Sequence, residues 1–172
     1  MDTTPGIAAA PASPEATPAL RACLVSLGGS AYAVDVRSAR EVAVFDEITL
    51  VPRAAQHLVG VANLRGTIVP IVDIRGALGL PEARSARSVR TLVVRDGSFV
   101  VAAVVDSVLG LEPFDAVLPL DTPAAARARG PRPFAVGWIS WAGEIVPVLD
   151  IPRLLATLRT TVSAVAPAQE VA

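Results

Sequence analysis

Short apolar runs, each ended by glycine, proline or aspartate, follow one another along most of this chain. They are six to ten residues long and rich in β-branched residues, a pattern typical of β-strands. Only IPRLLATL, residues 151–158, has convincing helical spacing of its apolar residues, and Pro152 suits the first turn of a helix. The sequence therefore predicts an all-β fold with short helices. The strand candidates are ACLVSL, AYAVDV, HLVGVANL, TIVPIVDI, TLVVRD, FVVAAVVDSV, FAVGWISW and EIVPVLDI.

The two ends of the chain differ from this pattern. Residues 1–20 carry prolines at positions 5, 11, 14 and 18, which prevent a continuous helix, and Asp2 stands where a secretory signal would be positively charged. We therefore expect a flexible Pro/Ala-rich tail there. Residues 161–172 are expected to form a second tail, frayed or weakly helical. The folded domain is predicted to span residues 21–160.

Composition excludes several classes of protein. With 172 residues, 52% of them hydrophobic, the chain can form one ordinary domain or two small ones that share a core. Its net charge of −1 predicts no nucleic-acid partner recognised by bulk charge. The longest apolar run after the tail is 99–105, far short of the roughly 20 residues that span a bilayer, so we expect no direct membrane insertion.

One segment of the sequence is repeated. GVANLRGTIVPIVDIRGAL, residues 60–78, and GWISWAGEIVPVLDIPRLL, residues 137–155, share eight identities in nineteen ungapped positions at an offset of 77. Further upstream, CLVSLGGSAYAVDV resembles TLVVRDGSFVVAAV more loosely. The chain is therefore predicted to consist of two similar β units.

Features that recur in both copies of the repeat are interpreted as structural. Pro70 recurs as Pro147; because proline lacks an N–H, we expect an edge strand or a bulge at both positions. Asp73 recurs as Asp150, and each precedes a short apolar segment. Helix N-caps are therefore favoured over a pair of catalytic carboxylates.

Arg65 does not recur. Its counterpart in the second copy is Ala142, and Asn63 is matched by Ser140, so the turn folds without a guanidinium group. A charge isolated in apolar sequence needs a partner or an exposed task. We predict that Arg65 forms a charge-assisted hydrogen bond with Glu41 on the surface of the neighbouring strand.

At these residues the sequence resembles a known family. HLVGVANLRGTIVPIVDIRGALGL is similar to the signature of the CheW-like adaptors of bacterial chemosensory arrays, a Gly-Val-x-Asn-Leu-Arg-Gly turn followed by an Ile-Val-Pro-Ile-Val-Asp-Leu strand. The similarity extends upstream through YAVDVRSAREV and downstream through VVDSV, over residues 21–160. It implies two intertwined SH3-like five-stranded barrels, which agrees with the repeat.

The resemblance also implies a function. The family links the cytoplasmic tips of methyl-accepting chemoreceptors to the regulatory domain of the histidine kinase CheA, as a non-enzymatic scaffold that uses no cofactor. A cytoplasmic location, with recruitment to membrane-associated or cytoplasmic receptor arrays, is expected. The alternative is a CheW-like regulator of a gliding, pilus or other non-flagellar pathway, which the sequence does not separate from the flagellar adaptor.

Residue roles carry over by position. The resemblance assigns coupling to the kinase to Glu41, Arg65 and Asn63. It implies that five small residues, together with Glu41, line a receptor-binding groove between the barrels. Because side chains alternate along a strand, about half of the valines in this set would be expected to lie in a core instead. The five groove residues are Val36, Ala39, Val104, Val105 and Val108.

Other functions find less support in the sequence. An enzyme needs a nucleophile with a base, a metal set or a phosphate loop, and a chain with one Cys and one His shows none of these. We assign Cys23 and His57 to packing. Trp138 and Trp141 replace Val61 and Leu64 of the first copy, so core filling is favoured over a stacking platform. The two arginine-bearing loops, 80–90 and 121–133, are interpreted as solvated connections.

Overall fold

The computed structural model describes residues 20–81, 89–123 and 133–163. Residues 1–19 and 164–172, which hold most of the two predicted tails, lie outside the described residues, as do residues 82–88 and 124–132 of the arginine-bearing loops. The described part contains ten strands and one helix. They are β1 (Leu20–Leu27), β2 (Ser30–Asp35), β3 (Ala39–Phe45), β4 (Leu58–Leu64), β5 (Thr67–Val72), β6 (Val89–Asp96), β7 (Phe99–Val104), β8 (Ser107–Phe114), β9 (Ala135–Trp141), β10 (Glu144–Leu149) and α1 (Ile151–Ser163).

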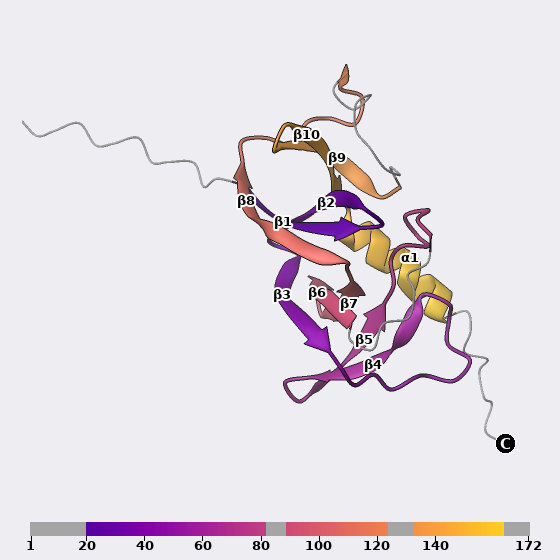
Figure 1. The fold of residues 1–172 in the computed structure, drawn as a ribbon. Coiled ribbons are helices and arrows are strands. Elements are labelled where there is room, and N and C mark those ends of the chain that lie inside the picture. The colour runs from indigo at the N-terminus through magenta and orange to yellow at the C-terminus, as the bar shows by residue number, and fades with distance from the viewer. Residues whose placement is uncertain (1–19, 82–88, 124–132, 164–172) are drawn as a thin grey trace, which may run out of the picture.

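The strands form two curled five-stranded sheets with α1 beside them (Figure 1). The first sheet has the order β8-β1-β2-β10-β9 and is called barrel A; the second has the order β3-β6-β7-β5-β4 and is called barrel B. Neighbouring strands are antiparallel except for the pairs β2–β10 and β5–β7, which are parallel. The predicted all-β architecture of two five-stranded units is confirmed.

The barrels are intertwined. The first repeat unit supplies β1 to β5 and the second supplies β6 to β10, but barrel A combines β1 and β2 with β8, β9 and β10. Barrel B combines β3, β4 and β5 with β6 and β7. Each barrel therefore needs both halves of the chain, and neither half can complete a barrel alone.

Each sheet is closed by a short backbone bridge between its two edge strands. In both sheets the bridge begins just after the edge strand that comes first in the chain. Thr49, just beyond β3, exchanges two hydrogen bonds of 2.9 Å with Val61 of β4. Leu118, just beyond β8, pairs in the same way with Trp138 of β9, at 2.7 and 2.9 Å. These equivalent bridges join strands that lie at opposite ends of the sheet order, and so turn each open sheet into a barrel.

The repeated glycines allow these bridges to form. A Cβ atom at Gly60 would lie 2.6 Å from the carbonyl oxygen of Thr49, and one at Gly137 would lie 2.6 Å from that of Leu118. Such distances are far inside van der Waals contact, so only glycine permits the bridging backbone to approach. The Gly60/Gly137 identity in the repeat thus has a direct physical cause.

The repeated prolines lie in interior strands, so the prediction of an edge strand or a bulge is wrong. Val61 directs its backbone N–H and C=O toward Thr49 and so makes no hydrogen bond to Pro70, its partner in β5. The backbone nitrogen and carbonyl of Pro70 therefore point away from β4, toward β7. The pairing of β5 with β7 begins only at Ile71. Pro70 thus occupies a site beyond the end of that ladder, and Pro147 occupies the matching site before Val148 of β10.

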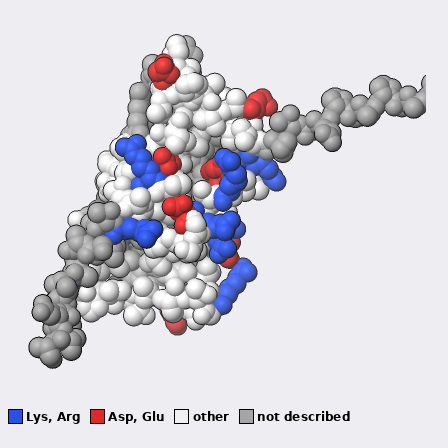
Figure 2. Space-filling model, turned by 180° about the vertical axis from the view of Figure 1, so that it is seen from behind, with Lys and Arg blue, Asp and Glu red and all other residues white. Residues whose placement is uncertain are grey.

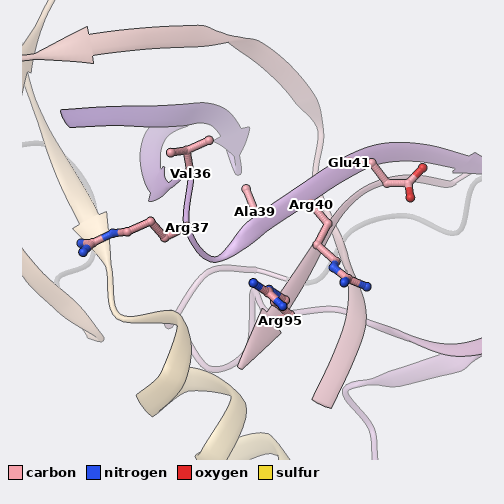
Figure 3. A pocket seen from close by; sticks show the side chains of 6 residues that line it. All are labelled: Val36, Arg37, Ala39, Arg40, Glu41 and Arg95. Carbon is pink, nitrogen blue, oxygen red and sulfur yellow. The ribbon is translucent and has the colours of Figure 1, made fainter. Parts of the chain in front are cut away.

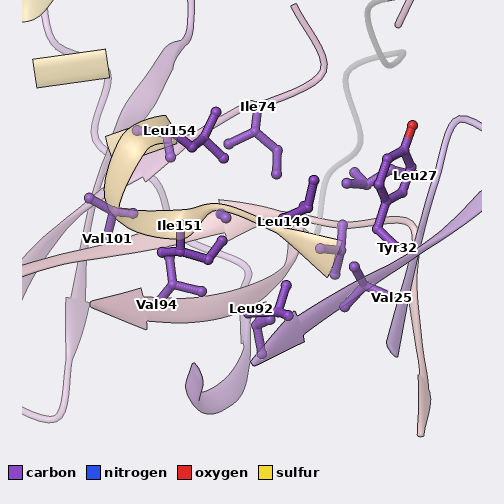
Figure 4. Packing of buried hydrophobic residues seen from close by; sticks show 14 of the residues in the cluster. Val25, Leu27, Tyr32, Ile74, Leu92, Val94, Val101, Leu149, Ile151 and Leu154 are labelled. Carbon is purple, nitrogen blue, oxygen red and sulfur yellow. The ribbon is translucent and has the colours of Figure 1, made fainter. Parts of the chain in front are cut away.

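The core has three parts. One cluster fills barrel A, a second fills barrel B, and the largest lies between the barrels, where residues from both sheets and α1 meet (Figure 4). Strands β1, β2, β6 and β7 send alternate side chains into a barrel and into this shared core. Burial on both faces explains their unbroken apolar runs. Trp138 is among the largest fully buried side chains, which confirms its role in core filling.

The two repeated aspartates hold the chain where it leaves β5 and β10. Asp150 accepts a 3.0 Å hydrogen bond from the N–H of Arg153 and is the N-cap of α1. Asp73 accepts one of 2.9 Å from the N–H of Arg75, and a single helical turn follows, closed by the bond from Leu78 N–H to the Ile74 carbonyl. Capping by both aspartates is confirmed. Helix α1 contributes Ile151, Leu154, Leu155 and Leu158 to the shared core.

Candidate protein-interaction surfaces

The β4–β5 hairpin carries Arg65 on its two-residue turn. Arg65 and Gly66 both have positive φ, 52° and 88°, as the mirror-image type I′ turn requires. The N–H of Gly66 donates a 2.6 Å hydrogen bond to Oδ1 of Asn63, which fixes the turn. The equivalent turn in barrel A has φ values of 50° at Ala142 and 80° at Gly143. The geometry of the turn therefore does not depend on the arginine.

The predicted ion pair is confirmed. Arg65 Nη2 lies 2.7 Å from Glu41 Oε2, and the Arg65 side chain is 79% exposed. Glu41 belongs to β3 and Arg65 follows β4, the two edge strands of barrel B that the Thr49 bridge brings together. Because exposed pairs contribute only about 0–1 kcal/mol to stability, this pair chiefly fixes where the guanidinium group is presented.

Apolar side chains accompany Arg65 on the same edge of barrel B. Ile68, paired with Asn63 across the hairpin, is 64% exposed, and Leu50, next to the bridging Thr49, is 75% exposed. Asn63, Arg65, Leu50 and Ile68 are together called the hairpin face. An exposed arginine that shares one edge of a barrel with large exposed apolar residues is typical of protein-binding surfaces.

The predicted groove residues separate into two groups. Val36 is exposed, and Ala39 and Val108 are half-buried, so all three offer surface to a partner. Val104 and Val105 are buried, the first in the core of barrel B and the second in the shared core. Their assignment to the groove needs correction, because consecutive residues on this doubly covered segment point into two different cores.

A hollow of about 480 Å³ lies where the β2–β3 connection meets β6 (Figure 3). It contains two of the predicted groove residues and one predicted coupling residue. Sequence reasoning missed its basic side chains, which were not distinguished from other surface arginines. The lining residues are Val36, Arg37, Ala39, Arg40, Glu41 and Arg95.

A charge network that the sequence analysis also missed joins the two barrels. Arg75 is only 3% exposed; it contacts Asp73 at 3.1 Å and also pairs with Asp106. Asp106 in turn accepts a 2.6 Å hydrogen bond from the N–H of Gly28 in the β1–β2 turn of barrel A. The repeat contained a signal for this network, because Arg75 aligns with Pro152 and is, like Arg65, a charge present in one copy only.

The side chains of catalytic type are placed for packing. Cys23 lies in the shared core, and burial raises the pKa of its thiol, which disfavours the reactive thiolate. Burial lowers the pKa of His57. Within the described ranges, no group of three or more potential metal-ligating side chains occurs. The described part of the chain also has no helix long and apolar enough to cross a membrane.

The profile of the CheW-like domain matches residues 21–159. The chain belongs to the CheW-like family. Among the CheW-like proteins it resembles are the chemotaxis protein CheW of Klebsiella aerogenes, with 32% identity over 49% of this chain and 51% of that protein, and the protein FrzA of Myxococcus xanthus, with 31% identity over 65% and 70%. The protein PilI of Pseudomonas aeruginosa is 30% identical over 65% of this chain and 61% of that protein.

The match to the CheW protein from Klebsiella spans about half the length of that protein. The CheW-like fold is also seen in the scaffolding protein TtCheW from Thermoanaerobacter tengcongensis. That crystal structure superposes with a TM-score of 0.67 at 20% identity, covering 83% of this chain and 91% of the other. The intertwined barrels described above are thus the architecture shared with this CheW protein.

Proposed function

We propose that this protein is a cytoplasmic, non-enzymatic adaptor that couples chemoreceptors to the histidine kinase CheA. The observation that carries the proposal is Arg65, a CheW-like signature residue held exposed on a turn that does not need it. Ala142 adopts the same backbone conformation in the equivalent turn, so the guanidinium group of Arg65 is not needed to form the turn and is available for binding.

The two partners are assigned to two surfaces. The hairpin face would bind the regulatory domain of CheA, with Arg65 held by Glu41 and flanked by exposed Ile68. The rim formed by Val36, Ala39 and Val108 would bind the cytoplasmic tip of a chemoreceptor. Well-packed barrels provide a rigid frame between the surfaces, so both partners can be held at once in a defined arrangement.

An adaptor of this kind changes kinase activity only through different affinities for the kinase's states. Such coupling typically corresponds to about 1–3 kcal/mol, so two moderate and separable interfaces are expected. With a single obligate interface, a change in the state of the receptor could not alter the affinity of the adaptor for the kinase.

Pairwise binding of purified components tests the assignment of the surfaces. Arg65→Ala should weaken binding to the CheA regulatory domain by about tenfold, since one interfacial charge contact is lost, and leave receptor-fragment binding unchanged. Arg21→Ala, which removes an exposed arginine from barrel A, is the matched control. Equal effects of both substitutions on kinase binding would contradict the role of the hairpin face.

A stability measurement completes this test. Arg65→Asn keeps a residue that tolerates positive φ and removes the guanidinium group. We expect it to fold at least as stably as the wild type and to bind the kinase as weakly as Arg65→Ala. Full kinase binding by Arg65→Asn would show that the turn, and not the charge, is recognised.

A further inference from the structure

Three of the six residues that line the hollow are arginines, and two others, Val36 and Ala39, belong to the receptor rim. Arg37, Arg40 and Arg95 contribute three positive charges and Glu41 one negative charge, a local balance of 3 − 1 = +2 in a chain whose net charge is −1. On the face seen in Figure 2, basic side chains gather near the middle of the molecule with acidic ones among them. The overall charge of −1 therefore does not describe the hollow, where positive charges outnumber negative ones.

Irregular strand pairing places Arg40 in the hollow. Along β3, Ala39 pairs with Val94 and Glu41 with Val93, so Arg40 is the extra residue of a β-bulge. Bulges bend a strand and redirect side chains. The bulge is anchored on one side, where the N–H of Arg95 donates a 2.9 Å hydrogen bond to the Ser38 carbonyl. In Figure 3 the guanidinium groups of Arg40 and Arg95 extend to the same side of the hollow.

The other charges of the hollow are already neutralised. Arg37 lies 2.5 Å from Asp35, and this hydrogen bond lowers the pKa of the Asp35 carboxyl group. Glu41 is engaged by Arg65. Among the described residues, no hydrogen bond or ion pair reaches the guanidinium group of Arg40 or Arg95. Two guanidinium groups therefore line the same hollow with their N–H donors unpaired in the described part of the chain. A carboxylate that bound there would accept hydrogen bonds from them and relieve the repulsion between the two positive charges.

The surface beyond the hollow distinguishes a protein partner from a small anion. Along β3, the exposed positions Arg40, Val42 and Val44 alternate with half-buried ones. A free phosphate or nucleotide would leave the two exposed valines uncovered. A helix or extended segment with carboxylates at one end and apolar side chains along one face would cover both features.

We propose that the hollow binds carboxylates of an acidic, amphipathic protein segment whose apolar face covers Val42 and Val44. This inference rests on the proposed adaptor function, and it assigns the segment to the receptor tip that docks on the neighbouring rim. The receptors served by this protein would then be selected by acidic side chains at the docking position, through electrostatic complementarity.

The binding test uses Arg40→Gln/Arg95→Gln, which keeps side-chain length and removes both charges. Binding of receptor-tip fragments from the same organism should weaken by about tenfold at ~0.1 M salt, with a shallower dependence on salt concentration, while CheA regulatory-domain binding is unchanged. Arg21→Gln/Arg53→Gln, which changes the net charge equally at exposed sites outside the hollow, should bind the receptor like the wild type. Equal losses in both double variants, or no loss in the first, would overturn the inference.

A second titration identifies the chemical class of the ligand. The full chain labelled with ¹⁵N is titrated with a helical peptide that carries Glu at one end and a Leu face, with the same peptide bearing Gln for Glu, and with inorganic phosphate. The Glu peptide should shift the Nε–H signals of Arg40 and Arg95 and bind at least tenfold more tightly than the Gln peptide. Equal binding of the two peptides, or saturation of the same signals by submillimolar phosphate, would overturn the inference.

The two proposals fail separately. If the wild-type protein binds no receptor tip but binds the Glu peptide through Arg40 and Arg95, the hollow is an acidic-segment site and the receptor assignment is wrong. If it binds receptor tips and the Arg40→Gln/Arg95→Gln variant binds them equally well, the adaptor function stands and the hollow has no part in it.

Discussion

Closure of the barrels depends on two glycines, and replacing either one tests whether the bridges hold the fold together. In Gly60→Ala the new Cβ would lie 2.6 Å from the carbonyl oxygen of Thr49 and 2.6 Å from Cγ2 of Ile48. The first of these atoms belongs to the backbone and cannot move aside without separating the bridge. Gly137→Ala creates the same 2.6 Å conflict with Leu118 in barrel A.

The magnitude follows from two contributions. Overpacking of this kind costs typically ~1–3 kcal/mol. Loss of the bridge removes two backbone hydrogen bonds of 2.9 Å between Thr49 and Val61, each contributing about 0.5–1.5 kcal/mol. We therefore expect Gly60→Ala to lower the free energy of unfolding by about 3 kcal/mol, which corresponds to a fall of ~10 °C in Tm for a domain of this size.

Urea denaturation followed by circular dichroism and by tryptophan fluorescence measures this loss. Both tryptophans, at 138 and 141, lie in β9 of barrel A, whereas Gly60 lies in barrel B. Because the largest core cluster is shared between the barrels, the two probes should report the same shifted midpoint. Gly76→Ala is the control: nothing lies within 4 Å of its Cβ position, and it should stay within about 1 kcal/mol of the wild type. A wild-type midpoint for Gly60→Ala would refute the bridging argument.

Three further measurements address single interactions. Asp150→Ala removes the N-cap of α1 and should cost about 1 kcal/mol in thermal unfolding; an unchanged Tm would show that the 3.0 Å cap contributes nothing. Asp106→Ala leaves the buried Arg75 with Asp73 alone, and we expect a loss of roughly 2 kcal/mol in urea, less than for a fully buried pair because Asp106 is partly exposed; a loss of zero would mean that water replaces the carboxylate. Because the pKa of His57 is lowered below 6.5 on folding, its contribution to stability is complete above about pH 6.5 and is lost as the pH falls through the folded value; a His57→Gln variant with the same acid-side slope would contradict this.

Periodicity and the internal repeat predicted an all-β fold of two similar units, and the resemblance to the CheW-like family implied that these units form intertwined barrels. The runs around residues 60–78 and 137–155 share the residues that close the barrels, form the turns and cap the following segments, because both copies meet the same local constraints. The strand order was harder to predict from local sequence. A proline such as Pro70 is typical of an edge strand, and only the long-range register shows that it lies beyond the end of the β5–β7 ladder, where no N–H is needed.

A side chain could be placed from the sequence where it broke the repeat. Arg65 stood out against Ala142, and its ion pair with Glu41 was correctly predicted. Val104 and Val105 could not be placed from the sequence, because a strand buried on both faces shows no alternation that would reveal which side chains reach solvent. Arg40 was missed because a β-bulge leaves no local signature in the sequence.

Assembly of three components tests the central claim, that one protein bridges a receptor and the kinase through two surfaces. Receptor-tip fragments are immobilised, and capture of the CheA regulatory domain is measured with and without this protein. We predict capture only when the wild-type protein is present, and its loss with Arg65→Ala although that variant still binds the receptor. No capture by the wild-type protein, or competition between the receptor fragment and the kinase domain for it, would contradict the adaptor function.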